Sequence, residues 1–272
     1  MSYNRRTVDS ASFARAARFL LDAHASRARF AALPADCAPA SVGEAYAVQD
    51  AFVALKATRC GAQAGWKIAL ATPQMQRMVG VDTPIAGAMH AGQLLRAPAE
   101  VRAADYGRLI VEFEIAAELG KDLPPRERPY TADEAADAVV ALLPAFELAD
   151  DRNADYGALA ARGLDLIADN AWNEGAVLGA RIEDWRRIDL AVLRGAASIN
   201  GEVVGEGFGG DTMGHPLNVV AWMANNLSGR GKGLRRGELV ITGSLVTSKF
   251  PQAGDRVGFD AGALGAIALA VS

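Results

Sequence analysis

The 272-residue chain is long enough for one large domain or two ordinary ones, and its 51% apolar residues can fill a sizeable core. The 28 basic and 32 acidic residues give a net charge of -4, which excludes the basic surface of a nucleic-acid-binding protein. No apolar run reaches the roughly 18 residues that a membrane-spanning helix needs. We therefore expect a globular protein with neither a nucleic-acid nor a membrane partner.

The first residues and the cysteines both favour a cytoplasmic location. Arg5 and Arg6 could open a twin-arginine export signal, but the residues that follow are polar and charged instead of apolar. Cys37 and Cys60 have a spacing that fits neither a disulfide framework nor a zinc site. Unpaired thiols are typical of a reducing compartment, so we expect the protein in the cytoplasm.

The N-terminal part of the chain is predicted to be helical, with helices over 13–33 and 42–61. Ser41 and Glu44 form a capping-box pattern at the start of the second helix, because each side chain can bond a backbone amide of the other. The character of the sequence changes near the end of this helix. We therefore predict a helical N-terminal region over 1–62.

Residues 63–272 alternate strands with occasional helices and form the predicted β-rich catalytic domain. The pair Asn200-Gly201 predicts a tight hairpin, because both residue types accept the positive φ of such a turn. This mixture of elements predicts an α+β fold. The other expected elements are strands over 65–70, 109–120, 144–150 and 237–243, a hairpin over 255–271, and helices over 72–80, 132–143 and 216–227.

Two carboxylates interrupt the strand predicted over 109–120. Glu112 and Glu114 are separated by one residue, so in a strand their side chains point to the same face. Two buried carboxylates side by side repel each other unless a cation lies between them. The alternative is that this face meets solvent and that Phe113 faces the core. The pattern alone leaves both interpretations open.

Glu147 is a third acidic residue inside an apolar strand, the one predicted over 144–150. If this strand neighbours that of Glu112 and Glu114, the three carboxylates can converge on one hard divalent cation. An all-oxygen set of ligands favours Mg²⁺ or Mn²⁺. The three histidines of the chain are scattered and do not suggest a zinc site.

Lys67 poses the same question in the strand predicted over 65–70, where it lies between Trp66 and Ile68. A buried ammonium group could act as an acid or base, with burial lowering its pKa and nearby carboxylates raising it. The alternative is a lysine on an edge strand, with its stem packed and its amino group in water. The pattern does not decide between them.

Several segments, in order along nearly the whole chain, resemble the 2-keto-4-pentenoate hydratases and their relatives, the 2-oxo-hept-4-ene-1,7-dioate hydratases and 4-oxalocrotonate decarboxylases. All belong to the fumarylacetoacetate hydrolase superfamily. The Glu-x-Glu pattern is shared across the superfamily, whereas the segment around Lys67 and GHPLN are typical of the hydratase and decarboxylase branch. The segments are EAYAVQ (44–49), GWKIALATPQMQRMVGVDTP (65–84), VEFEIA (111–116), LPAFEL (143–148), DLIADNA (165–171), GHPLNVVAWMAN (214–225), ITGSL (241–245) and AGDRV (253–257).

The resemblance implies a mixed β-roll or barrel of the fumarylacetoacetate hydrolase type behind the helical N-terminal region, assembled as a homo-oligomer. It implies Mg²⁺ or Mn²⁺ as cofactor, held by Glu112, Glu114 and Glu147. Lys67 would be the acid/base residue, with Asp82 beside it. The substrate would be a small 2-hydroxy-2,4-dienoate or its 2-oxo tautomer from aromatic meta-cleavage catabolism, and addition of water would give a 4-hydroxy-2-oxo acid.

Three more residues concern the substrate in this resemblance. Ser244 of ITGSL would contact it. Trp172 stands where hydratases commonly have serine, so its ring either narrows the pocket or packs away from it. Lys249 could bind the second carboxylate of a diacid, and the alternative is an exposed loop lysine. We favour a small monoacid such as 2-hydroxypenta-2,4-dienoate.

Two rival functions stay open. Decarboxylation of 4-oxalocrotonate uses the same enolate as its electron sink, so the expected site does not separate the two reactions. The chain could also be a non-catalytic partner subunit of a related decarboxylase. The three glutamates and Lys67 argue for activity.

Overall fold

The computed structural model describes residues 10–272, so Arg5 and Arg6 lie outside the described residues. Within that range, α-helices and strands are joined by loops and short 3-10 turns. The helices are α1 (Ser10–Ser26), α2 (Val42–Cys60), α3 (Pro73–Val79), α4 (Ala132–Ala138), α5 (Gly163–Ala168) and α6 (Pro216–Ser228). The strands are β1 (Gln63–Ala69), β2 (Ile85–His90), β3 (Leu94–Arg96), β4 (Ala99–Val101), β5 (Leu109–Leu119), β6 (Val139–Asp150), β7 (Asn173–Leu178), β8 (Arg194–Ile199), β9 (Glu202–Phe208), β10 (Leu239–Ile241), β11 (Val246–Lys249), β12 (Arg256–Asp260) and β13 (Ala266–Val271).

Local sequence signals explain where most helices begin and end. Ser41 caps α2 by accepting a hydrogen bond from the Glu44 amide at 3.2 Å. Gly80 ends α3 in the left-handed conformation with φ 77°, which glycine adopts without steric cost. The helix predicted over 13–33 is shorter than expected: α1 ends at Ser26.

The helix predicted over 132–143 is wrong beyond Ala138. The chain continues directly from α4 into β6, which starts at Val139 and pairs with β5 on one side and β7 on the other. Val139 and Val140 are β-branched and fit a pleated surface better than a helix. Backbone hydrogen bonds to the strands on both sides therefore favour a strand here over the helix that the sequence pattern predicts.

The strands form two sheets and confirm the α+β class. The larger sheet has the order β2-β1-β10-β5-β6-β7-β3, with β11 also pairing with β5, and the smaller has the order β4-β13-β12-β8-β9. Neither sheet closes on itself within residues 10–272, so a closed barrel is not formed. Phe113, Phe146 and Phe259 pack ring against ring between the two sheets, with centroids 5.7 to 6.3 Å apart.

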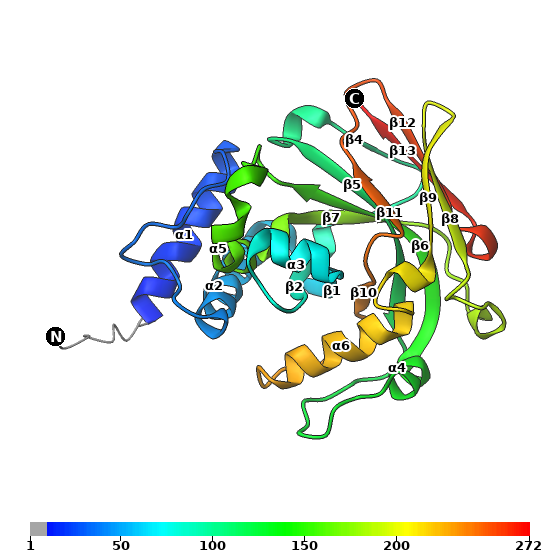
Figure 1. The fold of residues 1–272 in the computed structure, drawn as a ribbon, viewed down its shortest axis with the longest axis horizontal. Helices are drawn as coiled ribbons and strands as arrows, with labels where there is room; N and C mark the ends of the chain where they lie inside the picture. The colour runs from blue at the N-terminus through cyan, green and yellow to red at the C-terminus, as the bar shows by residue number, and fades with distance from the viewer. Residues whose placement is uncertain (1–9) are drawn as a thin grey trace.

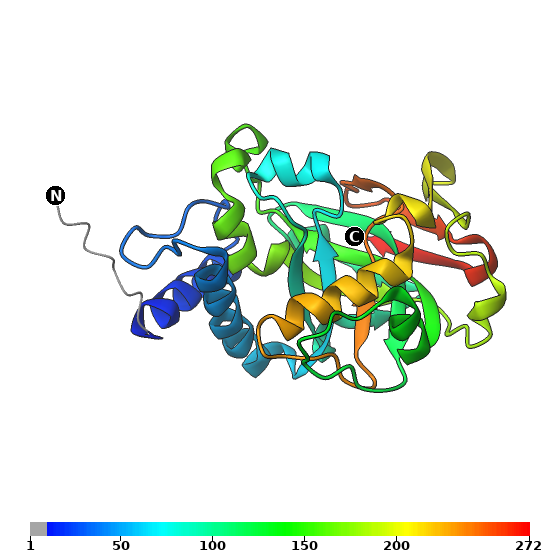
Figure 2. The ribbon, with the colours of Figure 1, turned by 60° about the horizontal axis from the view of Figure 1, so that its bottom comes forward.

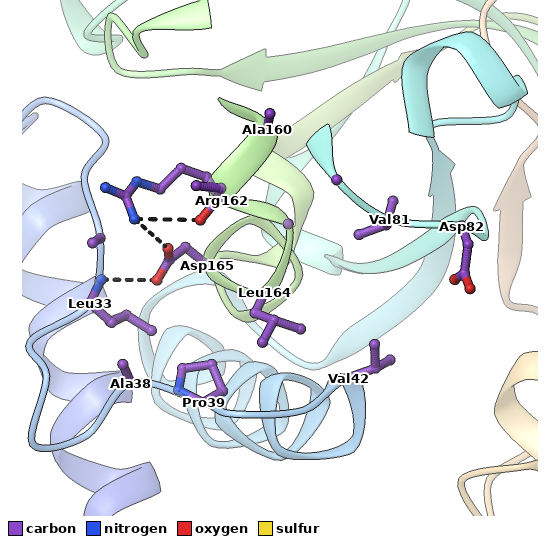
Figure 3. Close-up of a pocket in the computed structure, with 14 residues that line it drawn as sticks. Leu33, Ala38, Pro39, Val42, Val81, Asp82, Ala160, Arg162, Leu164 and Asp165 are labelled. Carbon is purple, nitrogen blue, oxygen red and sulfur yellow. Dashed lines mark hydrogen bonds and ion pairs between the residues drawn. The ribbon is translucent and has the colours of Figure 1, made fainter. Parts of the chain in front are cut away.

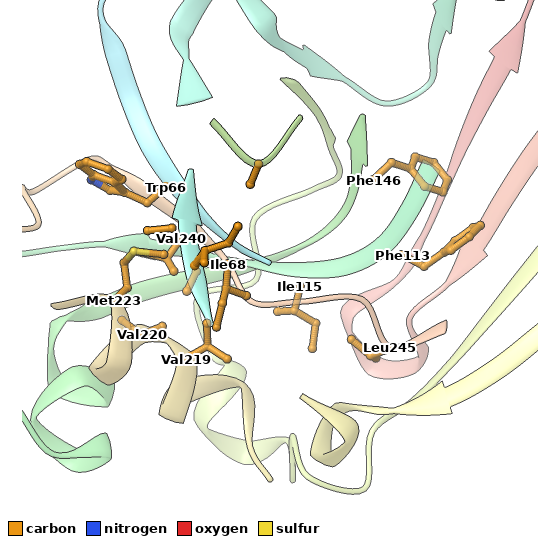
Figure 4. Close-up of a cluster of buried hydrophobic side chains, with 14 of the residues drawn as sticks. Trp66, Ile68, Phe113, Ile115, Phe146, Val219, Val220, Met223, Val240 and Leu245 are labelled. Atoms are coloured by element: carbon orange, nitrogen blue, oxygen red, sulfur yellow. The ribbon is translucent and has the colours of Figure 1, made fainter. Parts of the chain in front are cut away.

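Both expected hairpins are present in the smaller sheet. The β8–β9 pair turns on Asn200 and Gly201, which have φ values of 53° and 89°. β12 and β13 pair in antiparallel register. Helix α6 covers the larger sheet, where Val219, Val220 and Met223 belong to the same buried cluster as β-strand side chains such as Ile68 (Figures 2 and 4).

The helices α1 and α2 lie together with α5 at one end of the molecule (Figure 1). Their apolar side chains form a separate buried cluster that includes Phe52 of α2 and Ala168 of α5. Because α5 belongs to the C-terminal part of the chain, the helical region shares its core with the β-rich part. None of the helices in the described range combines the length and apolarity that crossing a bilayer requires.

Candidate metal centre

The three glutamates meet in the middle of the larger sheet. Glu112 and Glu114 lie on β5 and Glu147 on β6, and the antiparallel register places Glu112 directly opposite Glu147. One carboxylate oxygen from each residue lies within 4.8 Å of the others. The structure therefore brings together three residues that the sequence places on two strands joined by a helix.

Burial distinguishes the two interpretations of the acidic face. Glu114 and Glu147 are 0% exposed, and Glu112 is partly buried. Phe113 is 0% exposed as well, so β5 is buried on both faces at this point. A solvent-facing strand is therefore wrong, and the carboxylates need partners inside the protein.

Two of the carboxylates are oriented by hydrogen bonds from the segment around β11. The Gly243 amide donates to Oε2 of Glu114 at 2.6 Å, and the Ser248 hydroxyl donates to Oε1 of Glu112 at 2.6 Å. The sequence interpretation missed Ser248, although it lies next to Lys249. Its place on a strand that pairs with β5 is visible only in the fold.

Glu147 is oriented by two donors on the same oxygen. Lys67 Nζ lies 2.9 Å and Asn173 Nδ2 lies 3.0 Å from its Oε1. Lys67 is 2% exposed on β1, which pairs with β2 and β10, so the alternative of an edge lysine in water is wrong. The carbonyl oxygen of Ala171 also accepts from Lys67 Nζ at 3.4 Å. The sequence gives no reason to single out Asn173, apart from its position directly after DNAW (169–172).

The carboxylates and the lysine shift each other's protonation. Burial raises the pKa of Glu114, and repulsion from Glu147 and Glu112 raises it further. Burial also raises the pKa of Glu147, and Lys67 only partly opposes this rise. Burial lowers the pKa of Lys67, but attraction to Glu147 and Glu112 outweighs it, so the net shift is upward. The protein alone thus supplies one cation for three carboxylates, and the upward shifts of the two buried glutamates reflect this imbalance.

Two buried oxygens of this group have no hydrogen-bond partner within residues 10–272. They are Oε1 of Glu114 and Oε2 of Glu147, and both are buried. Buried carboxylate oxygens without donors are costly unless a cation completes them. Three converging carboxylates are hard oxygen ligands, and they fit a divalent ion such as Mg²⁺ or Mn²⁺.

Asp82 makes no hydrogen bond or ion pair with this group among residues 10–272. It is exposed in the loop between α3 and β2, and no hydrogen bond or ion pair is found between it and Lys67. Instead it lines a surface pocket of about 660 Å³ on the side away from the contact between Arg162 and Asp165 (Figure 3). The expected position of Asp82 beside Lys67 stays a prediction.

Ser244 lies just before β11, and Lys249 is the last residue of that strand. The Ser244 hydroxyl accepts a hydrogen bond from the Phe113 amide at 2.9 Å and donates one to the Val246 carbonyl at 2.6 Å. It therefore links the backbone of β5 to the backbone of β11. Lys249 Nζ lies 3.6 Å from where a β-carbon on Gly205 of β9 would be. Its side chain is therefore directed toward the smaller sheet, while the preceding residue faces Glu112.

Trp172 packs mainly against other aromatic rings. Its ring meets Phe30 edge to face, with centroids 5.1 Å apart, and lies 6.4 Å from the ring of Tyr156. The side chain is partly buried, and its Nε1 is buried without a partner in the described range. Trp172 directly follows Ala171, whose carbonyl oxygen contacts Lys67.

The fold and the glutamate group together define a class of protein. Residues 61–272 match the family described as fumarylacetoacetate (FAA) hydrolase C-terminal, and the chain belongs to this family. The 4-oxalocrotonate decarboxylase from Pseudomonas putida G7, solved with magnesium and adipate, has the same fold, with a TM-score of 0.88 at 24% identity. That match covers 98% of this chain and 100% of the other.

Two relatives place the chain more narrowly within the family. It is 34% identical over 237 residues to a 2-keto-4-pentenoate hydratase of Burkholderia vietnamiensis (strain G4 / LMG 22486), covering 87% of this chain and 88% of the relative. It is 30% identical over 254 residues to a 2-oxo-hept-4-ene-1,7-dioate hydratase of Escherichia coli, covering 92% and 94%. The expected membership of the superfamily is therefore confirmed.

Proposed function

We propose that the protein is a divalent-metal-dependent hydro-lyase that adds water to a 2-hydroxy-2,4-dienoate and releases a 4-hydroxy-2-oxo acid. The observation that carries this proposal is the buried contact of Lys67 Nζ with Glu147, 2.9 Å away, inside the group of three glutamates. The names of the relatives described above support the hydratase reaction. The fold alone is equally compatible with a decarboxylase.

In this proposal Glu112, Glu114 and Glu147 hold Mg²⁺ or Mn²⁺. When bound, such an ion supplies Lewis-acid stabilisation of negative charge on a 2-oxo acid. Lys67 holds a proton at Nζ and delivers or accepts it at the dienoate carbon chain. The Ala171 carbonyl and Glu147 hold its Nζ beside the carboxylates.

The substrate is a small monoacid rather than a diacid in this proposal. A second carboxylate would need a cation near the glutamates, and Lys249 is directed toward Gly205 instead. Arg108 is already paired with both oxygens of Asp151. The aromatic ring of Trp172 suits an apolar chain end. Several expectations from the sequence stay predictions. For the site, these are the choice between Mg²⁺ and Mn²⁺ and the roles of Asp82 and Ser244. For the protein as a whole, they are the division at residue 62, homo-oligomerisation, association with a related decarboxylase and the cytoplasmic location.

A substrate panel tests the function. With Mg²⁺ present, we expect the purified chain to consume 2-hydroxypenta-2,4-dienoate fastest, followed as loss of dienol absorbance without CO₂ release. The heptadienedioate and 4-oxalocrotonate should react more slowly. Preference for a diacid that Lys249→Ala abolishes and Trp172→Ser leaves intact would overturn the monoacid assignment. CO₂ release from 4-oxalocrotonate would favour the decarboxylase, and no turnover by metal-loaded protein would favour a non-catalytic subunit.

A further inference from the structure

The segment 169–174, with the sequence Asp-Asn-Ala-Trp-Asn-Glu, connects the glutamates to the N-terminal helices. Its Asn173 is 1% exposed, and the side-chain Nδ2 donates to Oε1 of Glu147 at 3.0 Å. Lys67 Nζ contacts the same oxygen at 2.9 Å. With two donors on Oε1, Oε2 of Glu147 is left as the oxygen without a partner in the described range. Asn173 therefore helps to decide which oxygen of Glu147 is left without a donor.

The backbone of this segment does not adopt its conformation freely. Asn170, Ala171 and Trp172 have φ values of 55°, 50° and 61°, and none of them is glycine. Residues with a β-carbon rarely occupy the left-handed region, and each such residue costs free energy. Three in succession persist only where the surroundings hold them in place.

The two ends of the strained stretch are held by different parts of the protein. The side-chain amide of Asn170 makes two hydrogen bonds to the backbone of Ala88 on β2. It accepts one from the Ala88 amide at 2.7 Å and donates one to the Ala88 carbonyl at 2.8 Å. At the other end, Lys56 Nζ of α2 donates to the Asn173 carbonyl at 3.1 Å. The same ammonium group lies 2.8 Å from Oε2 of Glu174.

Glu174 is in turn fixed by α1 and by the loop before β3. Its Oε1 lies 2.7 Å from Nδ1 of His24, and its Oε2 accepts from Gln93 at 2.9 Å. Lys56 is buried, with its side chain 7% exposed, so its ammonium group depends on these partners. Lys56 and Glu174 thus hold the backbone of the residue whose side chain orients Glu147.

We propose that Asn173 is a positioning residue for Glu147. We also propose that Lys56 of α2, paired with Glu174 of β7, holds Asn173 in place. The proposal rests on the metal centre of the proposed function. Partners that orient metal-binding carboxylates affect affinity for the ion as well as activity. A purely structural role for these residues would change the stability of the fold but not the affinity of the folded protein for the ion.

The test is calorimetric titration of Mn²⁺ into folded Asn173→Ala and Lys56→Met, with turnover of the dienoate measured in parallel. Asn173→Ala should weaken Mn²⁺ binding about 10- to 100-fold, because one of two donors on Glu147 Oε1 is lost. Lys56→Met should weaken it less, because the Asn173 side chain stays. In both variants kcat at saturating metal should fall more than KM rises.

Lys232→Met is the matched control, because Lys232 also makes an ion pair with α2, through Asp50, but at the protein surface. It should bind Mn²⁺ like wild type. Wild-type Mn²⁺ affinity in folded Asn173→Ala would overturn the proposal, as would an equal effect of Lys232→Met. If wild type binds Mn²⁺ but turns over none of the dienoates, the proposed function fails, while weaker binding by Asn173→Ala still supports the positioning role.

Discussion

Two groups of buried charges meet at the segment 169–174, and they differ in whether the protein itself completes them. We call the first the glutamate cluster; its members are Lys67, Glu112, Glu114 and Glu147. We call the second the histidine cluster; its members are His24, Lys56, Arg152, Asp169 and Glu174. One has three carboxylates for one cation, and the other has two carboxylates shared among three basic side chains.

The carboxylate oxygens show the difference directly. In the histidine cluster all four have partners: His24 and Arg152 bond Asp169, and His24 and Lys56 bond Glu174. Burial raises the pKa of Asp169, but Arg152 and His24 outweigh it, and the net shift is downward. In the glutamate cluster burial raises the pKa of both Glu114 and Glu147, and the net shift of each is upward. Removing one partner from a completed buried cluster leaves a buried charge unpaired and destabilises the fold, whereas an incomplete cluster is poised for a ligand.

The largest expected effect comes from removing one charge of the glutamate cluster. Glu114→Gln should abolish Mn²⁺ binding and nearly all turnover, because a ligand oxygen is replaced by an amide. The free energy of unfolding of the metal-free variant should rise, because a buried carboxylate with an unpartnered oxygen disappears. Calorimetry and urea unfolding measure both. Glu118→Gln on the same strand, paired with Arg181, is the control, and an unchanged Mn²⁺ titration in Glu114→Gln would refute the centre.

Removing the cation of the glutamate cluster should separate binding from chemistry. Lys67→Met should slow turnover about 10² to 10⁴-fold, the range for loss of a general acid or base. Mn²⁺ binding should persist, because the carboxylates lose a competing ammonium group. Steady-state kinetics and titration check this, with Lys249→Met as a lysine directed elsewhere. A parallel loss of Mn²⁺ affinity would assign Lys67 to holding the site together.

The same kind of change in the histidine cluster should act on stability. Asp169→Asn should lower the free energy of unfolding by about 3 to 5 kcal/mol, because Arg152 stays buried without its carboxylate. Urea unfolding measures the loss. Lys232→Met, which breaks only the half-exposed ion pair of Lys232 with Asp50, should cost about 1 kcal/mol or less. Equal losses in the two variants would contradict the distinction drawn between the clusters.

The smallest expected effect is a pH dependence in the histidine cluster. Burial lowers the pKa of His24, but Asp169 and Glu174 raise it more, so its net pKa lies above the ordinary 6.5. Arg152 also faces the ring and opposes protonation. A raised pKa stabilises the fold fully below the unfolded value, and this contribution is lost as pH rises through the folded value.

His24→Gln should therefore destabilise the protein more at about pH 5.5 than at about pH 8.5, and at both by less than Asp169→Asn. Urea unfolding of wild type and variant at the two pH values gives the difference. A larger loss at the higher pH would show that the ring is neutral in the folded protein.

Sequence patterns predicted the glutamate cluster far better than the histidine cluster. Glu112, Glu114, Glu147 and Lys67 are charges inside apolar strands, and such a mismatch is visible along the chain. The capping residue Ser41 and the Asn-Gly hairpin are equally local signals and were also predicted correctly. The common reason is that each depends on residues a few positions apart.

The features that were missed depend on the path of the chain in space. His24 and Asp169 are 145 positions apart, and Ser248 reaches Glu112 across 136. Periodicity predicts which face a side chain takes but not what lies opposite. Lys249 shows the same limit, because the irregular pairing between Val246 and Lys249 decides which residue of β11 faces the glutamates.

Gly87 sets a limit on how freely this chain can vary. It lies opposite Lys67 on β2, and a β-carbon there would be 3.1 Å from the lysine Cδ and 2.8 Å from the carbonyl oxygen of Asn170. A methyl group would thus press on the acid/base candidate and on the strained segment at once, without altering any charge. Which substitutions this centre tolerates therefore depends on the room beside Lys67 as well as on the charged side chains. Alanine at position 87 adds no charge and no polar group, but its methyl group has no room.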